Sequence, residues 1–298
     1  MPSLSAGLID LKEIKKSNVD RLFFYTKQIK AKKINSKLFG NVVLAFLESS
    51  TRTRLSFEMA ANNIGLSPVL FDVSQPTSLE KGETIQDSLL NIAAMKPKAL
   101  VVRCGQNLDL KQLSKKTNIP IACAGWGKVS HPTQALLDLY TISENFDSLA
   151  TKKILFVGDI VHSRVFASHV EVMKAMQISI GIISTEPFSN ADIKKFDSLE
   201  EALPWCDVCI ALRSQFERFS EGYSLDQQKF RQKFRIDADK LNLMDKYSIL
   251  MHPGPVNWDW ELDQSVLSDP RCRIFNQVEN GVYLREALLR TLCGELEL

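Results

Sequence analysis

The sequence predicts an α/β fold with two doubly wound parallel sheets, one in each of two successive domains. Short apolar runs alternate with segments of helical periodicity, a pattern typical of parallel strands joined by covering helices. This alternation occurs twice, with a long helical stretch between the two series. The length of 298 residues also favours two domains, at about 150 residues per domain.

The first series begins with an amphipathic helix between Lys12 and Lys37, whose basic face we expect to be solvated. A nucleic-acid-binding arm is the alternative for this segment. Four strands then alternate with helices that begin near Ser50, Gly82 and Leu108. The predicted strands are Val42–Leu47, Val69–Phe71, Ala99–Val102 and Ile119–Ala122.

A helical stretch from about Pro132 to Asn145 places the joint between the domains near residues 130–145. The second series follows, and a last helical stretch, Val282–Leu292, ends the pattern without a further strand. The predicted strands of the second series are Lys153–Val157, Ser179–Ile183, Asp207–Leu212 and Ser248–Met251.

Composition narrows the class of protein. The 37 Lys+Arg and 35 Asp+Glu leave a formal net charge of +2, which argues against a polyanion-binding protein. The apolar runs are far shorter than the ~20 residues that cross a bilayer, and the N-terminal segment does not resemble a secretory signal. We therefore expect a cytoplasmic protein that binds neither nucleic acid nor membrane.

The six cysteines lie far apart, mostly in apolar stretches, which favours reduced, buried thiols. Cys206 and Cys209 form a Cys-x-x-Cys pair, but a structural zinc site needs four ligands and no second pair follows. We therefore expect both thiols of this pair to be buried in the core. We expect no bound metal. No nucleotide-binding glycine motif occurs either, so no cofactor is implied.

The segment Ala45–Gly65 carries the clearest chemical signal. A buried strand ends shortly before a helix start, where free backbone N–H groups, hydroxyls and a guanidinium form a pocket for a phosphate or carboxylate. The residues of this pocket are Ser50, Thr51, Arg52 and Thr53. Arg54 is expected to pair with Glu58 at i,i+4. An ordinary capped helix is the alternative.

The stretch Ser49–Arg54, with sequence SSTRTR, resembles the phosphate-binding signature of the aspartate/ornithine carbamoyltransferases, as does SFE at Ser56–Glu58. Five further segments resemble the same family in the same order. They are HPTQALLDLYTI (His131–Ile142), VGDIVHSRV (Val157–Val165), LRSQFER (Leu212–Arg218), HPGPVN (His252–Asn257) and QVENGVYLR (Gln277–Arg285). The LRSQFER and HPGP segments are similar to the aspartate branch of the family.

The resemblance implies a carbamoyl phosphate-binding domain of residues 1–132 plus 280–298 and an aspartate-binding domain of residues 133–279. A long helix joins the two, and the C-terminal helix returns to the first. The resemblance also implies a homotrimer with shared active sites. It leaves open whether a regulatory chain or a dihydroorotase partner binds.

The implied reaction transfers the carbamoyl group of carbamoyl phosphate to the amine of L-aspartate, a step of pyrimidine biosynthesis. An oxyanion develops as the amine attacks, so donors aimed at that oxygen should dominate catalysis. By resemblance, the phosphate is held by Ser50, Thr51, Arg52 and Arg103. The carbamoyl group is contacted by Thr53, Arg103, His131 and Gln134, together with Pro253 and Gly254.

Aspartate brings two carboxylates, which planar guanidinium groups suit. The resemblance assigns Arg164 to the α-carboxylate, and Arg213 with Gln215 to the side-chain carboxylate. Lys81 and Ser78 match a loop that reaches the active site of a neighbouring subunit; a solvated turn is the alternative. The residues matched to an ion-pair network that orients the arginines are Glu48 and Arg218.

Two departures from the family pattern occur, at Trp126 and at Trp258, and neither removes a matched contact. Two other readings stay open. The chain could carbamoylate a different amine, or it could be a non-catalytic subunit that keeps the fold. An assay of several amines, with phosphate release as the readout, separates these readings.

Overall fold

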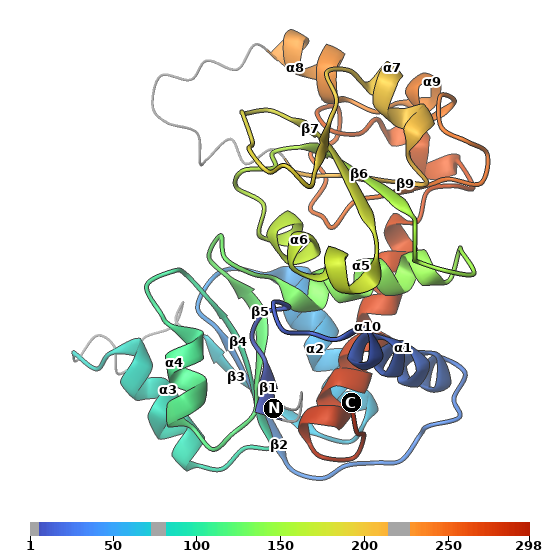
Figure 1. Ribbon diagram of the computed structural model, residues 1–298. Helices are drawn as coiled ribbons and strands as arrows, with labels where there is room; N and C mark the ends of the chain where they lie inside the picture. The colour runs from blue at the N-terminus through green and yellow to red at the C-terminus, as the bar shows by residue number, and fades with distance from the viewer. Residues whose placement is uncertain (1–5, 73–81, 214–226) are drawn as a thin grey trace. The chain divides into compact units, whose positions relative to one another are not determined.

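The computed structural model describes residues 6–72, 82–213 and 227–298, which divide between two compact units (Figure 1). Unit 1 consists of Met1–Tyr140 and Val278–Leu298, and unit 2 of Thr141–Gln277. Residues 133–140, which the sequence led us to expect in the second domain, therefore belong to unit 1. One contact that holds this stretch there is the edge-to-face packing of Tyr140 on Phe23, with ring centroids 5.4 Å apart.

Unit 1 is built on a five-stranded parallel sheet. Its elements are β1 (Gly7–Leu8), α1 (Lys16–Lys30), β2 (Asn41–Phe46), α2 (Thr51–Asn63), β3 (Ser67–Asp72), α3 (Ile85–Ala94), β4 (Ala99–Cys104), α4 (Leu110–Lys116), β5 (Ile121–Trp126), α5 (Pro132–Ser143) and α10 (Ile274–Leu292). The last two also extend into unit 2. The strands β2, β4 and β5 are buried along nearly their whole length, which is why each reads as a continuous apolar run.

The strand order of this sheet is β1-β5-β4-β2-β3. The chain passes from β2 to β3 on one side, then returns across β2 to β4 and β5 on the other. Adjacent parallel strands whose connections leave in opposite directions open a crevice at their carboxyl ends, and this is where doubly wound sheets bind ligands. In unit 1 that switch point lies between β2 and β4.

Unit 2 repeats the plan. Its elements are β6 (Lys153–Gly158), α6 (Arg164–Met176), β7 (Ser179–Ser184), β8 (Lys194–Lys195), α7 (Leu199–Ala202), η3 (Leu203–Trp205), β9 (Val208–Ala211), α8 (Gln227–Phe234), α9 (Ala238–Leu241), β10 (Ile249–Met251) and η5 (Gln264–Ser268). The strands run parallel in the order β10-β9-β6-β7-β8, so the switch point lies between β6 and β9.

The predicted fold class is confirmed: two parallel-sheet α/β units follow one another, and the C-terminal helix lies in unit 1 from Val278 onward. All eight predicted strands form. The two-residue strands β1 and β8 were not predicted, because two residues carry no hydrophobic period. The helix α10 begins at Ile274, eight residues before the predicted start at Val282. Gly281, which directly precedes the predicted start, lies inside the helix.

The Cys-x-x-Cys pair is buried, as predicted. Cys209 lies within β9, Cys206 precedes it, and both have exposures below 5%. Burial raises the pKa of the Cys206 thiol to about 12 and that of Cys209 well above its ordinary value, so both stay protonated at neutral pH. Across the described residues, no group of His, Cys, Asp and Glu side chains is arranged to hold a metal ion. No helix in the described ranges is long and apolar enough to cross a membrane.

Candidate active site

The helix start predicted to bind an anion lies at the switch point of unit 1. β2 ends at Phe46, and α2 begins at Thr51 with Ser50 as an extended N-cap, φ −162° and ψ 103°. In the described structure the Ser50 side chain forms no capping hydrogen bond to this helix. The first turn carries no acidic side chain. Its N–H groups therefore present positive partial charge to an anion outside the helix.

Three of the four side chains at this helix start are accessible. Ser50 is half-buried, Thr51 and Arg52 are exposed, and Thr53 is buried at 8% exposure. Arg54 pairs with Glu58, its Nε 3.8 Å from the Glu58 Oε1, as the i,i+4 spacing predicts.

Arg103 extends the anion site from the neighbouring strand. It lies at the carboxyl end of β4, in register with Phe46 of β2. Its Nε is 4.0 Å from the Glu48 Oε2, and its Nη1 donates to the Ala124 carbonyl oxygen of β5 at 3.4 Å. The guanidinium is thus held at the ends of β2, β4 and β5. The structure brings Arg103 and Glu48 together, as an orienting role for Glu48 requires.

His131 and Gln134 are both buried, at 5% and 8% exposure. His131 directly precedes α5, and Gln134 lies in its first turn. Pro132 occupies the first helical position, where its missing N–H costs nothing. The His131 carbonyl oxygen accepts from the Gln134 N–H at 3.0 Å, and the i,i+3 spacing puts the two side chains on one face. The side-chain Nε2 of Gln134 donates to the Asp138 Oδ1 at 2.8 Å.

The departure at Trp126 lies in the turn that leads to His131. The Trp126 N–H donates to the Ser130 carbonyl oxygen at 2.8 Å, and the Ser130 N–H donates back at 3.3 Å. Between them, Gly127 has φ +45°, and a Cβ there would lie 2.3 Å from the Gln106 Cγ. The turn therefore depends on the glycine and on backbone hydrogen bonds, which the tryptophan leaves intact.

In unit 2, both described arginines assigned to aspartate lie at the carboxyl edge of the sheet. Arg164 is the first residue of α6, whose N-cap Ser163 accepts from the Phe166 N–H at 3.2 Å. Arg213 directly follows Leu212, whose N–H donates to the Val157 carbonyl oxygen at 2.8 Å and so extends the β9 pairing with β6. The two arginines therefore flank the switch point between β6 and β9. Four assigned residues lie outside the described ranges: Ser78, Lys81, Gln215 and Arg218.

Pro253 and Gly254 follow β10, at the same edge of the second sheet. The His252 Nδ1 accepts from the Gly254 N–H at 2.8 Å, and the His252 N–H donates to the Gln277 Oε1 at 2.9 Å. These bonds fix the backbone at Pro253, whose carbonyl oxygen is the atom assigned to the substrate. Trp258, the second departure, packs against the hydrophobic core of unit 2.

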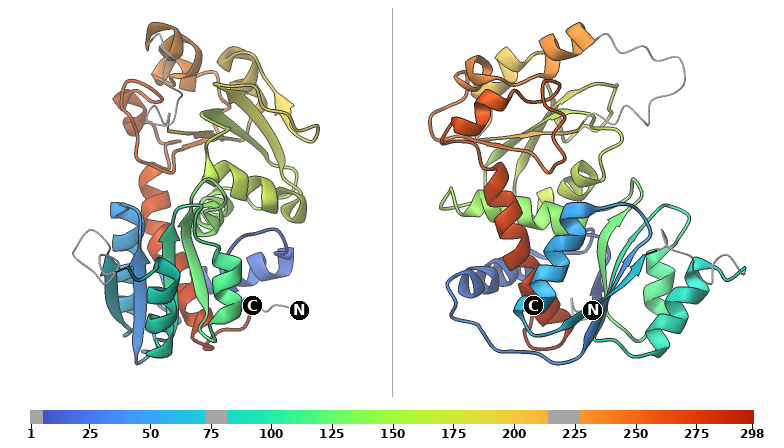
Figure 2. Two further views of the ribbon diagram at one scale, coloured as in Figure 1. Left: turned by 90° about the vertical axis from the view of Figure 1, so that its left-hand side faces the viewer. Right: turned by 180° about the vertical axis from the view of Figure 1, so that it is seen from behind.

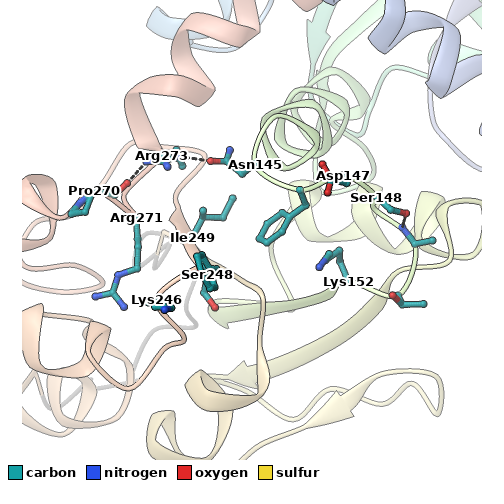
Figure 3. Close-up of a pocket in the computed structure, with 14 residues that line it drawn as sticks. Asn145, Asp147, Ser148, Lys152, Lys246, Ser248, Ile249, Pro270, Arg271 and Arg273 are labelled. Carbon is teal, nitrogen blue, oxygen red and sulfur yellow. Dashed lines mark hydrogen bonds between the residues drawn. The ribbon is translucent and has the colours of Figure 1, made fainter.

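A pocket of about 680 Å³ in unit 2 contains none of the predicted site residues (Figure 3). It lies beside the amino ends of β6 and β10, with Lys152, Ser248 and Ile249 in its lining. Its cations already have partners: the Lys152 Nζ is 3.6 Å from an Asp207 oxygen, and the Arg271 Nη2 is 2.8 Å from Asp269. Because doubly wound sheets bind ligands at the carboxyl edge, this pocket is not the candidate site.

Three buried polar residues next to the site were not predicted to have a role. Asp138 bonds to Gln134, while Arg285 of α10 donates to the Ser56 hydroxyl of α2 at 2.7 Å. Ser56 and Arg285 both lie inside the segments that resemble the family. Their burial and their partners, however, depend on helix packing that local sequence patterns do not contain.

Comparisons with known proteins identify the family of this chain. Residues 7–144 match the family model "Aspartate/ornithine carbamoyltransferase, carbamoyl-P binding domain", and residues 150–292 match "Aspartate/ornithine carbamoyltransferase, Asp/Orn binding domain". The chain is 39% identical over 291 residues to the aspartate carbamoyltransferase catalytic subunit of Campylobacter lari, with 97% of this chain and 99% of the relative covered. It is 34% identical to that of Sulfurovum sp., with 96% and 97% covered.

Solved structures show the same fold. Aspartate transcarbamoylase from Trypanosoma cruzi, in complex with carbamoyl aspartate and phosphate, superposes with a TM-score of 0.86 at 26% identity, covering 98% of each chain. Ornithine carbamoyltransferase from Thermus thermophilus superposes with a TM-score of 0.84 at 22% identity, covering 98% of this chain and 99% of that one. With both family models matched along most of its length, the chain belongs to the aspartate/ornithine carbamoyltransferase family.

Proposed function

We propose that the protein transfers the carbamoyl group of carbamoyl phosphate to the amine of L-aspartate, giving N-carbamoyl-L-aspartate and phosphate. The observation that carries this proposal is the meeting of the Ser50–Thr53 helix start and the Arg103 guanidinium at one switch point. An unblocked helix start beside an arginine suits a phosphate dianion. Relatives of this chain are named as aspartate carbamoyltransferase catalytic subunits.

In unit 1 the phosphate would bind to Ser50, Thr51, Arg52 and Arg103. Thr53, Arg103 and His131 would donate to the carbonyl oxygen, which becomes an oxyanion when the amine attacks. Donors that are already in place stabilise that charge without reorganisation. The leaving phosphate would take the proton of the attacking amine, so the enzyme supplies orientation and charge stabilisation.

The carbamoyl NH₂ would donate to the Gln134 side-chain oxygen and to the Pro253 carbonyl oxygen, with Gly254 beside it. Gln134 is suited to this role because its own NH₂ group is already bonded to Asp138. The side-chain oxygen is therefore the end of the amide that is left to accept from a substrate.

The two arginines of unit 2 favour aspartate over ornithine. Arg164 and Arg213 bring two positive charges to one sheet edge, which match the two carboxylates of aspartate. Ornithine carries a cationic side chain, which an arginine repels. Gln215 and Lys81 are assigned to aspartate from the resemblance alone.

The assembly is also part of the proposal. We infer a homotrimer in which Lys81 and Ser78 of one subunit complete the site of the next, as the family resemblance implies.

The enzyme would act in pyrimidine biosynthesis. Its free cysteines, four of them buried, suit a reducing compartment, and we propose the cytoplasm.

The test is a carbamoyl-transfer assay in which aspartate, ornithine and other amines are compared at equal concentration with carbamoyl phosphate. We expect carbamoyl-aspartate and phosphate to form in equal amounts, and ornithine to react at least about 100-fold more slowly. Preference for another amine would reassign the substrate. Absence of phosphate release under saturating conditions would favour a non-catalytic subunit.

A further inference from the structure

The side-chain amide of Gln134 is hydrogen-bonded to a buried carboxylate. Its Nε2 donates to the Asp138 Oδ1 at 2.8 Å, one helical turn further along α5. Asp138 is fully buried and Gln134 is 8% exposed. An ionised carboxylate accepts hydrogen bonds and donates none, so it can bond only to the NH₂ end of the amide. The Gln134 Oε1 must then lie on the side away from Asp138.

A buried arginine lies close enough to this carboxylate to feel its charge. Arg285 of α10 is 3% exposed, and its Nη1 donates to the Ser56 Oγ at 2.7 Å and to the Gly281 carbonyl oxygen at 3.4 Å. Its guanidinium carbon lies 5.1 Å from the centroid of the Phe57 ring. An unpaired charge at either position would be costly, because both are out of reach of water.

The charge on Arg285 survives its burial. Desolvation lowers the pKa of Arg285 to about 10, and the attraction of Asp138 opposes that shift. A group with this pKa is still protonated at neutral pH. The Arg285 guanidinium is therefore charged at working pH.

The guanidinium lies close to a glycine of its own helix. The part of α10 in unit 1 runs beside α2 (Figure 2), and Gly281 lies where α10 approaches α2 and α5. A Cβ at Gly281 would be 2.7 Å from the Arg285 Nη1, 3.3 Å from the Leu137 Cδ2 and 3.7 Å from the Ser56 Oγ. The glycine inside α10 thus leaves room for the Arg285 guanidinium in its present position.

We propose that Asp138 is a positioning residue that holds the Gln134 amide with its oxygen toward the substrate, so that the site selects an acyl phosphate that carries an NH₂ group. This inference rests on the proposed function, in which Gln134 accepts from the carbamoyl NH₂. Acetyl phosphate has the same size and charge but a methyl group in place of the NH₂. The fixed amide therefore predicts that carbamoyl phosphate binds at least about 10-fold more tightly than acetyl phosphate.

The decisive variant is Asp138→Asn. An asparagine amide can donate as well as accept, so Gln134 can rotate and present either end to the substrate. We expect the preference for carbamoyl phosphate over acetyl phosphate to fall to within about 3-fold, because the fixed acceptor is lost. Binding of inorganic phosphate, which has no NH₂ group, should stay within about 2-fold of wild type.

Two further variants distinguish the loss of a fixed Gln134 orientation from a general loss of packing around it. Asp138→Asn combined with Arg285→Met removes both charges together, so it avoids an unpaired buried guanidinium and should show the same loss of preference. Thr291→Val is the matched control. It removes a buried hydroxyl from the same helix, one that donates to the Ala287 carbonyl oxygen at 3.0 Å, and it should keep the wild-type preference.

The measurements are dissociation constants of the full-length protein for the two acyl phosphates and for inorganic phosphate, determined without aspartate. Equal binding of both acyl phosphates by the wild type overturns the inference, even where aspartate is carbamoylated normally. Retention of the preference in either Asp138 variant also overturns it. Failure of the proposed function is seen separately, as absence of carbamoyl-aspartate formation by the wild type.

Discussion

Glu48 and Arg103 form an ion pair at the carboxyl edge of the first sheet, with 4.0 Å between the Oε2 and Nε atoms. Glu48 follows β2, and Arg103 is the second-last residue of β4. The Leu47 N–H donates to the Arg103 carbonyl oxygen at 2.8 Å. The pair therefore joins the two strands that border the switch point. It sets the direction of the guanidinium that both phosphate and carbonyl oxygen are proposed to use.

Loss of this orienting charge should weaken catalysis without abolishing it. For Glu48→Gln we expect kcat/KM for carbamoyl phosphate to fall about 10-fold, because Arg103 keeps its bond to the Ala124 carbonyl oxygen but loses its ionic partner. Glu58→Gln is the control, since Glu58 pairs with Arg54 on the flank of α2. Equal losses of kcat/KM in the two variants would show that the effect comes from removing a negative charge anywhere near α2, and not from breaking the Glu48–Arg103 pair.

Loss of Arg52, the exposed arginine at the start of α2, should reduce catalysis more than loss of the Glu48 charge. Arg52→Ala would remove the proposed charge-assisted contact to the leaving phosphate, so kcat/KM should fall by at least about 100-fold. Arg54→Ala, two positions on, should stay near the wild-type rate because Arg54 is engaged with Glu58. A near-normal rate in the correctly folded Arg52→Ala variant would contradict the assignment of the Ser50–Thr53 turn to phosphate binding.

The sequence predicts much of the fold and less of the site. Strands such as Val42–Leu47 could be found because burial on both faces leaves an uninterrupted apolar run. The roles of Asp138 and Arg285 could not, since they depend on three helices meeting in space. Gly281 shows the same limit: it precedes the predicted start of the last helix, whereas it lies inside α10 and close to the Arg285 guanidinium. The assignments of Lys81 and Gln215 rest on resemblance alone.

Arg213 should separate the two substrates. It lies in unit 2 and is assigned to aspartate, so Arg213→Ala should raise the KM for aspartate at least about 30-fold. Carbamoyl phosphate binding, measured alone, should stay within about 3-fold. Lys246→Gln, at the pocket beside the amino ends of the strands, is the control and should change neither value. Equal loss of both ligands in Arg213→Ala would indicate a structural role instead.

Asp263 should make the stability of unit 2 depend on pH in the acid range. Hydrogen bonds from Ser265, helped by Arg235, lower the pKa of Asp263 from 3.8 to about 2. A carboxyl with a depressed pKa stabilises the fold above its unfolded value, and the contribution is lost as the pH falls from about 4 through about 2. Asp263→Asn should therefore lower Tm by about 2 °C at pH 6, with the difference vanishing near pH 2.

The matched control for this measurement is Asp259→Asn. Asp259 also faces Arg235, at 3.7 Å, but its side chain is 57% exposed. Its removal should change Tm little at either pH, because an exposed ion pair is screened by water. A Tm difference for Asp263→Asn that persists at pH 2 would point to lost packing in place of the carboxylate's charge.

The proposed sharing of active sites between subunits leads to a quantitative prediction for hybrid trimers. Arg52→Ala and Lys81→Gln chains should each be nearly inactive alone, because each lacks one half of every site. After mixing in equal amounts, dissociation and reassembly, a site works only if its pocket comes from a Lys81→Gln chain and its lysine from an Arg52→Ala neighbour. Random assembly in a closed ring gives this combination at about a quarter of the sites, so about a quarter of wild-type activity should return. If Lys81 instead serves the site of its own chain, every site in the hybrids keeps one lesion and no activity returns.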